Sequence, residues 1–337
     1  MNDTQRAALE RFIARAAAAD RVTITKATRL SGGAIQENWQ LHARVDGGVH
    51  AGDAVWVLRT DAPSSVAASH GRAQEFALLA VAARAGVSVA QPLWLCTERE
   101  VIGRPFFIMG WVEGTAAGHV LARDPGVVAD RAQLALRLGH ELALIHSIRP
   151  PQPDLDFLPV GDEAPALQAV ARLRRELDAL PSPRPALAWG LRWLERHAPP
   201  RGEIVLCHGD FRTGNYLADV HGLAAILDWE FAGWGDPLQD IGWFCARCWR
   251  FGADTREAGG IGQRADFYRG YEATSGRRLD RGQVSYWEVM AHVRWAVIAL
   301  AQAHRHVSGE ETSLLLVLTG HIVPELEYEV LTMTEPA

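Results

Sequence analysis

Three polar residues in a fixed order carry the strongest chemical signal in this sequence. Asp210 is followed five positions later by Asn215, and Asp228 comes directly after an apolar run. Kinase-type phosphoryl transfer uses these residue types in this order. The first carboxylate accepts the proton of a substrate hydroxyl, while the amide oxygen and the second carboxylate hold Mg²⁺ against the phosphates of ATP. The spacing therefore favours a kinase-type site with ATP and Mg²⁺ as its cofactors.

The neighbouring segments predict elements that would bring these residues together. Residues 203–207 (EIVLC) read as a short apolar strand that could deliver Asp210 to a cleft. Residues 216–220 and 223–227 read as a hairpin, which would return the second Asp to the side of the Asn. A loop of turn-forming residues, with Asp210 as a helix cap, is the structural alternative. It would explain a lone Asp and Asn but not the whole pattern.

Together these segments resemble the aminoglycoside phosphotransferase (APH) and choline kinase-like superfamily of small-molecule kinases. The narrower likeness is to the phosphotransferase branch that includes the kinase-like domain of certain acyl-CoA dehydrogenase fusion proteins. Matching stretches run from about Leu30 to about His304. The resemblance implies an α+β, two-lobed, protein-kinase-like fold, with an antiparallel-sheet N-lobe carrying one helix and a mostly helical C-lobe. It also implies that Asp210 is the catalytic base and that Asn215 and Asp228 are the metal ligands.

Hydrophobic periodicity along the chain predicts a compatible order of elements. The first part is expected to contain a helix at 4–19, strands at 21–30, 35–45 and 54–60, a helix at 71–85, and strands at 92–97 and 105–112 around a turn at Gly103. Further helices are expected at 128–148, 163–180, 186–197, 237–250, 262–274, 283–305 and 311–331. We assign residues 1–110 to a nucleotide-binding N-lobe. Residues 111–337 would form a C-lobe with the catalytic loop, the metal site and the acceptor site.

The N-lobe offers four residues for the nucleotide site, three that could bind phosphate and one that would orient the cation. Gly32 and Gly33 lie between the first two strands, where glycine lets backbone N–H groups approach phosphate, although a plain hairpin turn gives the same pattern. By the resemblance, Arg59 stands where more distant family members have Lys. Lys26, the only lysine, comes too early in the chain to fill that role. Glu75 is the expected helix partner of Arg59. The alternatives are a solvated strand-end arginine and a solvated helix carboxylate.

The segment 109–114 (MGWVEG) resembles the hinge between the two lobes. Backbone groups of Met109 and Trp111 are therefore predicted to hydrogen-bond the adenine ring. The sequence does not distinguish ATP from GTP.

Residues beside the predicted base have more than one interpretation. His208 is predicted to hold the catalytic loop to the core rather than to act in acid–base chemistry. Arg212 either contacts the γ-phosphate or pairs with a nearby carboxylate. Glu230 departs from the D-F-G pattern and either reaches a metal-bound water or makes only a loop contact. Asp236, as a helix N-cap, and Asp240, as a brace of the catalytic loop, are predicted to be structural.

The acceptor is expected to bind the helical lobe near Asp210. Residues 243–305 contain ten arginines but only six acids, interleaved with four tryptophans. A polycationic aminoglycoside would favour an acidic cleft, so we predict a hydroxyl acceptor bearing a carboxylate or phosphate, such as an acyl- or CoA-linked compound. Arg294 and Trp295 are the predicted contacts. Solvated arginines with core tryptophans are the structural alternative, and an aminoglycoside-type antibiotic is the alternative acceptor.

Bulk properties limit the remaining functions. The 337 residues are 48% hydrophobic and 22% charged, an ordinary globular composition. A net charge of −6 gives no support to nucleic-acid binding, and the first residues lack an apolar signal core. Because no apolar run is as long as a membrane span, we expect a cytoplasmic protein with no membrane partner. Four scattered cysteines do not suit a disulfide scaffold. The oligomeric state stays open, with a homodimer as one option.

The leading interpretation is an enzyme of the EC 2.7.1 type that phosphorylates a hydroxyl of a small molecule. The competing class is a catalytically silent, nucleotide-binding pseudokinase, for which Arg59 in place of Lys is the only motive. A protein kinase is disfavoured, because the sequence after Asp228 has no A-P-E-like stretch and no room for a long activation loop. The identity of the acceptor is not encoded in any motif that we find.

Overall fold

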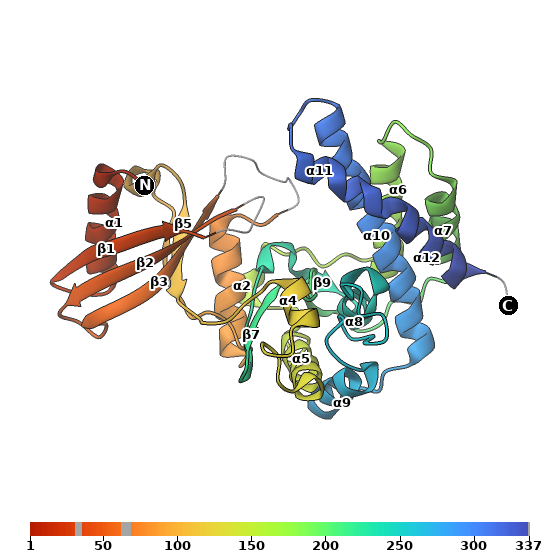
Figure 1. Cartoon of the computed structure of the whole chain (residues 1–337), viewed down its shortest axis with the longest axis horizontal. Helices are drawn as coiled ribbons and strands as arrows, with labels where there is room; N and C mark the ends of the chain where they lie inside the picture. Colours follow the sequence, from red (N-terminus) through yellow and green to blue (C-terminus); the bar gives the residue numbers. More distant parts are fainter. Residues whose placement is uncertain (31–35, 62–68, 336–337) are drawn as a thin grey trace.

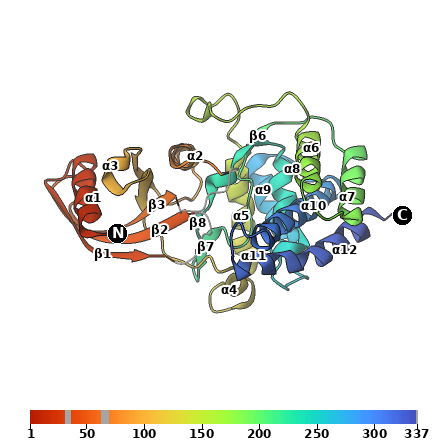
Figure 2. The ribbon, with the colours of Figure 1, turned by 90° about the horizontal axis from the view of Figure 1, so that it is seen from above.

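The computed structural model describes residues 1–30, 36–61 and 69–335 of the chain. They form a sheet-rich part and a larger helical part that stand side by side (Figure 1). Seen from above, the C-terminus lies at the end of the molecule far from the sheet (Figure 2). This arrangement places the nucleotide-binding candidates and the catalytic candidates on neighbouring parts of the molecule.

The sheet has five antiparallel strands in the order β1-β2-β3-β5-β4. The strands are β1 (Arg21–Arg29), β2 (Gln36–Asp46), β3 (Gly52–Asp61), β4 (Pro92–Cys96) and β5 (Phe106–Gly110). The helices of this part are α1 (Asp3–Ala16), α2 (Arg72–Arg84) and α3 (Arg99–Ile102). Arg59 lies in the central strand β3, opposite Asn38 of β2 and Phe107 of β5.

Helices α1 and α2 cover opposite faces of the sheet. Successive residues of a strand point to opposite faces, so Phe106 and Ile108 pack into the cluster of α1 whereas Phe107 packs into the cluster of α2. Arg59 is the cross-strand partner of Phe107 and therefore faces α2. The strand alternation thus decides that the predicted phosphate-binding cation points toward the helix that carries Glu75.

The other helices belong to the helical part. They are α4 (Gly118–Arg123), α5 (Arg131–Ile145), α6 (Pro165–Asp178), α7 (Pro185–Arg196), α8 (Pro237–Cys245), α9 (Arg264–Ser275), α10 (Arg281–Val307), α11 (Leu314–Thr319) and α12 (Val323–Thr334). Two short antiparallel pairs accompany them: β6 (Val205–Cys207) with β9 (Gly233–Gly235), and β7 (Tyr216–Asp219) with β8 (Gly222–Ile226).

Several elements differ from the sequence-based expectations. The predicted helix 237–250 ends at Cys245, because Ala246 has an extended ψ of 141°. The predicted helix 311–331 is two helices, since a 3-10 turn intervenes and α12 begins at Val323 with Pro324 in its first turn. A short helix, α3, replaces the simple turn at Gly103, so the sheet-rich part carries α1 and α3 in addition to the single helix α2 of the family plan. Helix α4 and strand β9 are too short for hydrophobic periodicity to reveal.

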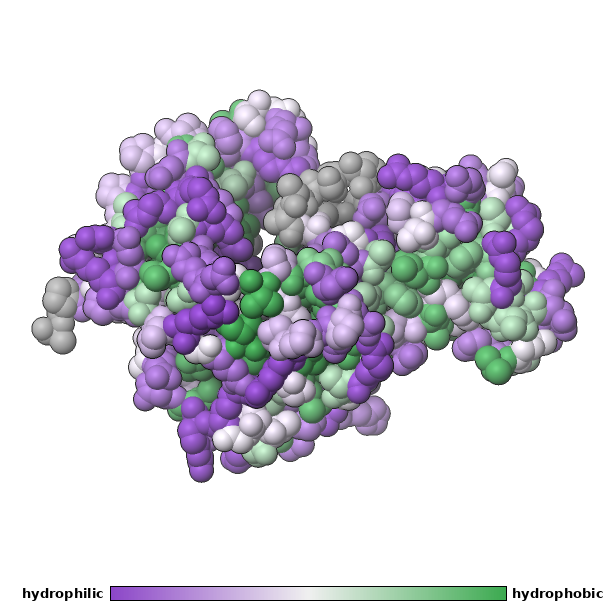
Figure 3. Space-filling model, turned by 180° about the vertical axis from the view of Figure 1, so that it is seen from behind, coloured by the Kyte–Doolittle hydropathy of each residue, from purple (hydrophilic) through white to green (hydrophobic). Residues whose placement is uncertain are grey.

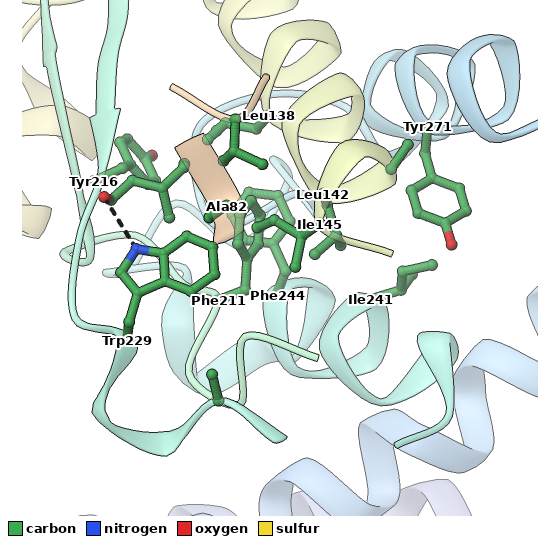
Figure 4. Packing of buried hydrophobic residues seen from close by; sticks show 14 of the residues in the cluster. Ala82, Leu138, Leu142, Ile145, Phe211, Tyr216, Trp229, Ile241, Phe244 and Tyr271 are labelled. Carbon is green, nitrogen blue, oxygen red and sulfur yellow. Dashed lines mark hydrogen bonds between the residues drawn. The ribbon is translucent and has the colours of Figure 1, made fainter. Parts of the chain in front are cut away.

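The largest hydrophobic cluster anchors the loops that carry the predicted catalytic residues. Phe211 and Trp229, which directly follow Asp210 and Asp228, project into this cluster with Phe244 of α8 (Figure 4). Trp229 is 1% exposed. Burying an aromatic or aliphatic side chain of this size contributes about 1.5–3 kcal/mol. Each predicted catalytic aspartate therefore has a firmly packed neighbour in the chain.

The outer surface is largely hydrophilic on the face turned away in Figure 1, with apolar residues gathered near the middle (Figure 3). Within the described part of the chain, none of the helices combines the length and apolarity needed to cross a bilayer. The large apolar side chains accordingly lie mainly in the clusters between elements.

Candidate active site

Strand β6 and the β7–β8 hairpin bring the three motif residues together. The catalytic loop begins directly after β6, and the hairpin begins directly after Asn215. Where the chain leaves the hairpin, the amide of Leu227 donates to the carbonyl of Asn215 at 2.9 Å. This bond sets Asp228 beside Asn215, as expected from the predicted hairpin.

Three donors hold the carboxylate of Asp210. Its Oδ1 accepts hydrogen bonds from Trp243 Nε1 at 2.8 Å and from Arg212 Nε at 3.1 Å. Its Oδ2 accepts one from Asn215 Nδ2 at 2.6 Å. These hydrogen bonds fix the orientation of the carboxylate. The Asp210 side chain is 14% exposed and is therefore still accessible to a ligand.

Asp240 holds the loop of His208 and Gly209 that precedes the predicted base. The buried carboxylate of Asp240 accepts from the backbone amides of His208 at 2.6 Å and Gly209 at 3.0 Å. Burial alone would raise the pKa of Asp240, but hydrogen bonds from His146 and from the amide of His208 hold it below its ordinary value. Gly209 has a φ of +79°, and a Cβ there would lie 2.2 Å from the carbonyl oxygen of Phe231. Glycine is therefore required at this position.

The ring of His208 joins the two halves of the motif. Its Nε2 lies 2.8 Å from the carbonyl oxygen of Leu227, and its Nδ1 lies 3.3 Å from the amide nitrogen of Asp210. These partners assign the ring proton to Nε2, which donates, and leave Nδ1 as an acceptor. Since the ring is fully buried and both nitrogens are used, the arrangement supports a structural role.

Arg59 is buried beside two carboxylates from different elements. Its Nη2 lies 2.7 Å from Glu75 Oε1 and 2.8 Å from Asp228 Oδ1. Burial lowers the pKa of Arg59, but the two carboxylates raise it more, so the pKa lies above its ordinary value. For Asp228 the effects are opposite: burial raises its pKa, but the charge of Arg59 holds the pKa below its ordinary value. Both groups are charged at neutral pH, and the ion pair connects β3 to the predicted metal loop.

A second arginine extends this chain of charges. Arg72, in the first turn of α2, bonds to Glu75 Oε2, and its Nε lies 2.9 Å from Asp61 Oδ1. Arg72 and Glu75 are 3% and 1% exposed, so Glu75 is buried between two guanidinium groups. Sequence reasoning missed Arg72. Its position three residues before Glu75 on a helix was the available signal.

Glu230 ties the predicted metal loop to the strand that follows the glycine loop. Its Oε2 accepts a hydrogen bond from Gln36 Nε2 at 2.6 Å, and both residues are buried. Burial and the neighbouring Asp228 raise the pKa of Glu230 to about 7. The side chain of Glu230 thus contacts strand β2, and a role at a metal-bound water stays a prediction.

Asn215 and Asp228 each leave an oxygen for a cation. Asn215 uses its Nδ2 to donate to Asp210. Its Oδ1 has no hydrogen-bond partner within residues that the structure describes. Asp228 Oδ2 is similarly free of partners in the described ranges, since Arg59 bonds to its Oδ1. A few hard oxygen ligands suit Mg²⁺, which keeps waters and takes phosphate oxygens for the rest of its shell. The two residues therefore fit a magnesium site.

The remaining nucleotide candidates lie in different places. Gly32 and Gly33 fall outside the described residues. Met109 lies in β5, and Trp111 follows the end of that strand. The amide of Trp111 donates to the carbonyl of Val55 at 3.3 Å, so this N–H is already engaged. Adenine binding at Met109 and Trp111 stays a prediction.

A sequence model described as "Phosphotransferase enzyme family" (APH) matches residues 26–277, which is most of the chain. The chain belongs to this family. The matched range begins before β2 and ends after α9, so it contains both Arg59 and the complete Asp210, Asn215 and Asp228 motif.

Similar proteins of known sequence include acyl-CoA dehydrogenase family member 10 of Mus musculus. It is 30% identical to this phosphotransferase family member over 184 residues. The similarity covers 52% of this chain but only 17% of the mouse protein. The chain therefore corresponds to a small part of that relative.

Solved structures share the architecture over nearly the whole chain. A Ralstonia eutropha JMP134 protein, named for the aminoglycoside phosphotransferases, superimposes with a TM-score of 0.75 at 21% identity, covering 97% of each chain. Aminoglycoside phosphotransferase APH(4)-Ia, a thermostable mutant solved with ADP and hygromycin B, gives a TM-score of 0.61 at 15% identity, covering 98% of this chain and 100% of its own. These likenesses confirm the predicted α+β, kinase-like fold.

On the predicted acceptor side of this family member, one arginine differs from the others. Of the ten arginines in 243–305, nine bind carboxylates or backbone carbonyls: Arg247, Arg250, Arg256, Arg264, Arg269, Arg277, Arg278, Arg281 and Arg305. Among described residues the guanidinium of Arg294 has no such partner; its carbon lies 4.4 Å from the ring centroid of Trp243. Burial and the nearby Arg172 lower the pKa of Arg294. The basic excess read from the sequence is thus mostly neutralised, with Arg294 as the exception.

A cleft of about 470 Å³ opens between α6 and the catalytic loop. Gly209, the residue before the base, lies on one side, and Arg172 and Arg175 of α6 lie on the other, together with Glu163. Within the described chain, Arg175 has no ion-pair partner. Sequence reasoning did not select α6, because its arginines follow an ordinary amphipathic pattern that a solvated helix would also show.

The predicted contacts Trp295 and Arg212 meet in a cluster of tilted aromatic rings beside the predicted base. The rings of Trp243 and Trp249 lie 5.1 Å apart, and those of Trp249 and Trp295 lie 5.0 Å apart. The guanidinium of Arg212 lies 4.6 Å over Trp249 while its Nε bonds to the carboxylate of Asp210. Arg212 thus makes the carboxylate pairing that was one of its two alternatives. Contact of either residue with an acceptor or a phosphate stays a prediction.

Proposed function

We propose that this phosphotransferase family member transfers the γ-phosphoryl group of ATP to a hydroxyl of a small molecule in a Mg²⁺-dependent reaction. The convergence of Asp210, Asn215 and Asp228 is the observation that carries the proposal. The side-chain amide of Asn215 donates to Asp210 at 2.6 Å, and the backbone carbonyl of Asn215 accepts from the amide of Leu227, just before Asp228, at 2.9 Å. This is the layout that positioning and charge neutralisation in phosphoryl transfer require.

In the proposed reaction, the acceptor oxygen bonds to the γ-phosphorus as the bond to the β,γ-bridging oxygen breaks. ADP leaves with the electron pair of that bond, and the hydroxyl proton passes to Asp210. Asn215 and Asp228 would hold Mg²⁺, which supplies positive charge at the phosphates. Arg59 adds a second positive charge and is fixed for this task by Glu75.

Nucleotide binding is supported by a structural neighbour. Aminoglycoside phosphotransferase APH(4)-Ia has been solved as a ternary complex with ADP and hygromycin B. The charges at Arg59 suit the phosphates of a nucleotide in this chain as well. ATP as the donor and an alcohol as the acceptor are our inferences for this protein.

We propose that the acceptor is anionic, as in a carboxylate- or phosphate-bearing acyl or CoA-linked compound. The guanidinium of Arg294 is without an acidic partner among described residues, and Arg172 and Arg175 line the cleft beside the catalytic loop. Arg172 is paired with Glu176 at 3.8 Å, so a polycationic antibiotic would meet repulsion mainly at Arg294 and Arg175. The similarity to an acyl-CoA dehydrogenase family member supports the same choice.

An acceptor panel tests this proposal. The protein with Mg²⁺ and ATP would be given matched pools of anionic, neutral and cationic hydroxyl compounds, and ADP release would be measured. We expect turnover with the anionic pool. We also expect Arg294→Gln to raise the KM of the active acceptor about tenfold, whereas Arg281→Gln, at an exposed ion pair, leaves it unchanged. Selective turnover of cationic amino sugars would refute the anionic acceptor.

A catalytically silent, nucleotide-binding regulator is the second candidate. It is favoured by one observation: Arg59 bonds directly to Asp228, so the arginine and a metal ion would share this carboxylate. Binding of Mg²⁺ and ATP with no ADP release in any pool would favour the regulator. Release that depends on one pool would exclude it.

A further inference from the structure

Trp243 contacts the catalytic candidate directly, although no motif points to it. Its indole Nε1 donates to Asp210 Oδ1 at 2.8 Å, and its side chain lies on α8, 3% exposed. A buried indole N–H that reaches a carboxylate makes a charge-assisted hydrogen bond, which is stronger than a bond between neutral groups. The contact is therefore more than aromatic packing.

The hydrogen bond completes the fixation of the carboxylate. Asn215 occupies Oδ2, while Trp243 and Arg212 both donate to Oδ1. A carboxylate held at both oxygens cannot rotate away from an incoming hydroxyl. Unlike Arg212, the indole fixes the base without adding a charge beside it.

The same indole also carries the unpaired cation of the acceptor side. The guanidinium carbon of Arg294 lies 4.4 Å from the ring centroid of Trp243, a distance typical of cation–π stacking. Trp249 packs against the ring at 5.1 Å and limits its movement. One side chain thus sets the position of both the base and the arginine that we assign to the acceptor.

Other tryptophans nearby show that this use of the N–H is specific. The indole nitrogens of Trp249, Trp287 and Trp295 are buried and have no hydrogen-bond partner in the described part of the structure. Trp243 packs in one cluster with Trp249 and Trp295, whereas Trp287 lies in a neighbouring cluster, and Trp243 differs from all three by its bond to Asp210. This difference provides a matched control for mutagenesis.

We infer that Trp243 is a positioning residue of the phosphoryl-transfer site, which orients Asp210 through its N–H and Arg294 through its ring. The inference rests on the proposed function, because it assigns Asp210 as the base.

Trp243→Phe tests the inference, because phenylalanine keeps an aromatic ring and removes the donor. We expect kcat to fall at least about tenfold with the KM of ATP unchanged, as for loss of a hydrogen bond to a charged group. Trp287→Phe removes an equally buried indole with an unpartnered nitrogen and should keep wild-type kcat. Equal kcat in Trp243→Phe and wild type, or equal losses in the two variants, would overturn the positioning role.

A spectroscopic readout separates this inference from the proposed function. The ¹⁵N-labelled protein should show one indole N–H resonance that is lost in Trp243→Phe and shifted in Asp210→Asn. If wild type turns over no acceptor, the proposed function fails, and the spectrum still decides the contact. A Trp243 resonance that does not move in Asp210→Asn overturns the inference.

Discussion

At the scale of single residues, the site is organised by a chain of alternating charges. Asp228, Arg59, Glu75 and Arg72 follow one another, and Asp61 ends the chain beside Arg72. Each buried guanidinium group is paired with two carboxylates, and Glu75 bonds to both Arg59 and Arg72. An alternating chain of this kind neutralises buried charges that would otherwise be costly. Arg59 can therefore remain buried and charged at the proposed phosphate site.

Removal of Glu75 should expose the cost of those charges. Glu75→Ala leaves Arg59 and Arg72 without their shared partner, and we expect the free energy of unfolding to fall by about 3–5 kcal/mol. Denaturant titration measures the change. Glu195→Ala, at an exposed pair with Arg192, should shift the midpoint very little. Equal effects of the two substitutions would contradict the central place of Glu75.

The structure brings together the residues that the sequence selects, but the sequence does not predict their contacts. Spacing selects Asp210, Asn215 and Asp228, because phosphoryl transfer restricts both residue type and order. The bond from Trp243 to Asp210 depends on where α8 lies relative to the catalytic loop, and no local pattern encodes that distance. Arg72 had a local signal in its spacing to Glu75, but its second partner, Asp61, lies in a different element and could not be predicted.

At the scale of elements, glycines let two helices approach closely beneath the site. Helices α5 and α9 cross where a Cβ on Gly270 would lie 1.9 Å from the carbonyl oxygen of Leu136, and one on Gly139 would lie 2.1 Å from that of Phe267. Both helices line the cluster that anchors the catalytic loop (Figure 4). The backbone contact therefore determines the position of the support for Phe211.

A methyl group at this crossing should force the helices apart. Gly270→Ala is expected to lower the free energy of unfolding by at least about 1–3 kcal/mol, the usual cost of overpacking. Thermal or denaturant unfolding would show the loss. The matched substitution Gly202→Ala adds a methyl group where no atom lies within 4 Å and should be tolerated. Equal stability of Gly270→Ala and wild type would refute the tight crossing.

Long elements could be predicted from the sequence, and short ones could not. Periodicity over 12 to 27 residues identifies α6, α7 and α10 nearly at their true limits. Strand β9 has three residues, and its pairing with β6 comes from tertiary contact alone. The early end of α8 at Cys245 is a backbone turn within an apolar sequence, so hydrophobicity gives no warning of it.

At the scale of the whole molecule, the site is shared by the sheet-rich and helical parts. Arg59 of β3 reaches Asp228, and Gln36 of β2 reaches Glu230. The fold class could be predicted because the motif carries a family resemblance that extends along the chain. Contacts between the two parts could not, since they join residues more than 160 positions apart.

The stability of the whole chain should depend on pH through His292. Burial lowers the pKa of His292 from 6.5 to about 4, so the unfolded chain binds its proton first as the pH falls. The contribution of neutral His292 is complete above pH 6.5 and is lost as the pH falls through 4. It amounts to about 3 kcal/mol, since one pKa unit corresponds to about 1.4 kcal/mol.

Denaturant unfolding at several pH values measures this effect. His292→Gln should lose less stability than wild type between neutral pH and about pH 4. The same change at the exposed His221 should leave the pH dependence as it is in wild type. Identical slopes in His292→Gln and wild type would show that His292 does not contribute.

Phosphoryl transfer through Asp210 is the central claim, and a product mass tests it most directly. The protein would be incubated with Mg²⁺, ATP and the pooled hydroxyl compounds, and mass spectrometry would search for an acceptor that gains one phosphoryl group. We predict such a product with wild type and its near-complete loss with Asp210→Asn, which keeps the shape of the side chain and removes the base. Absence of any product from wild type that binds Mg²⁺ and ATP, or equal product from the variant, would contradict the account.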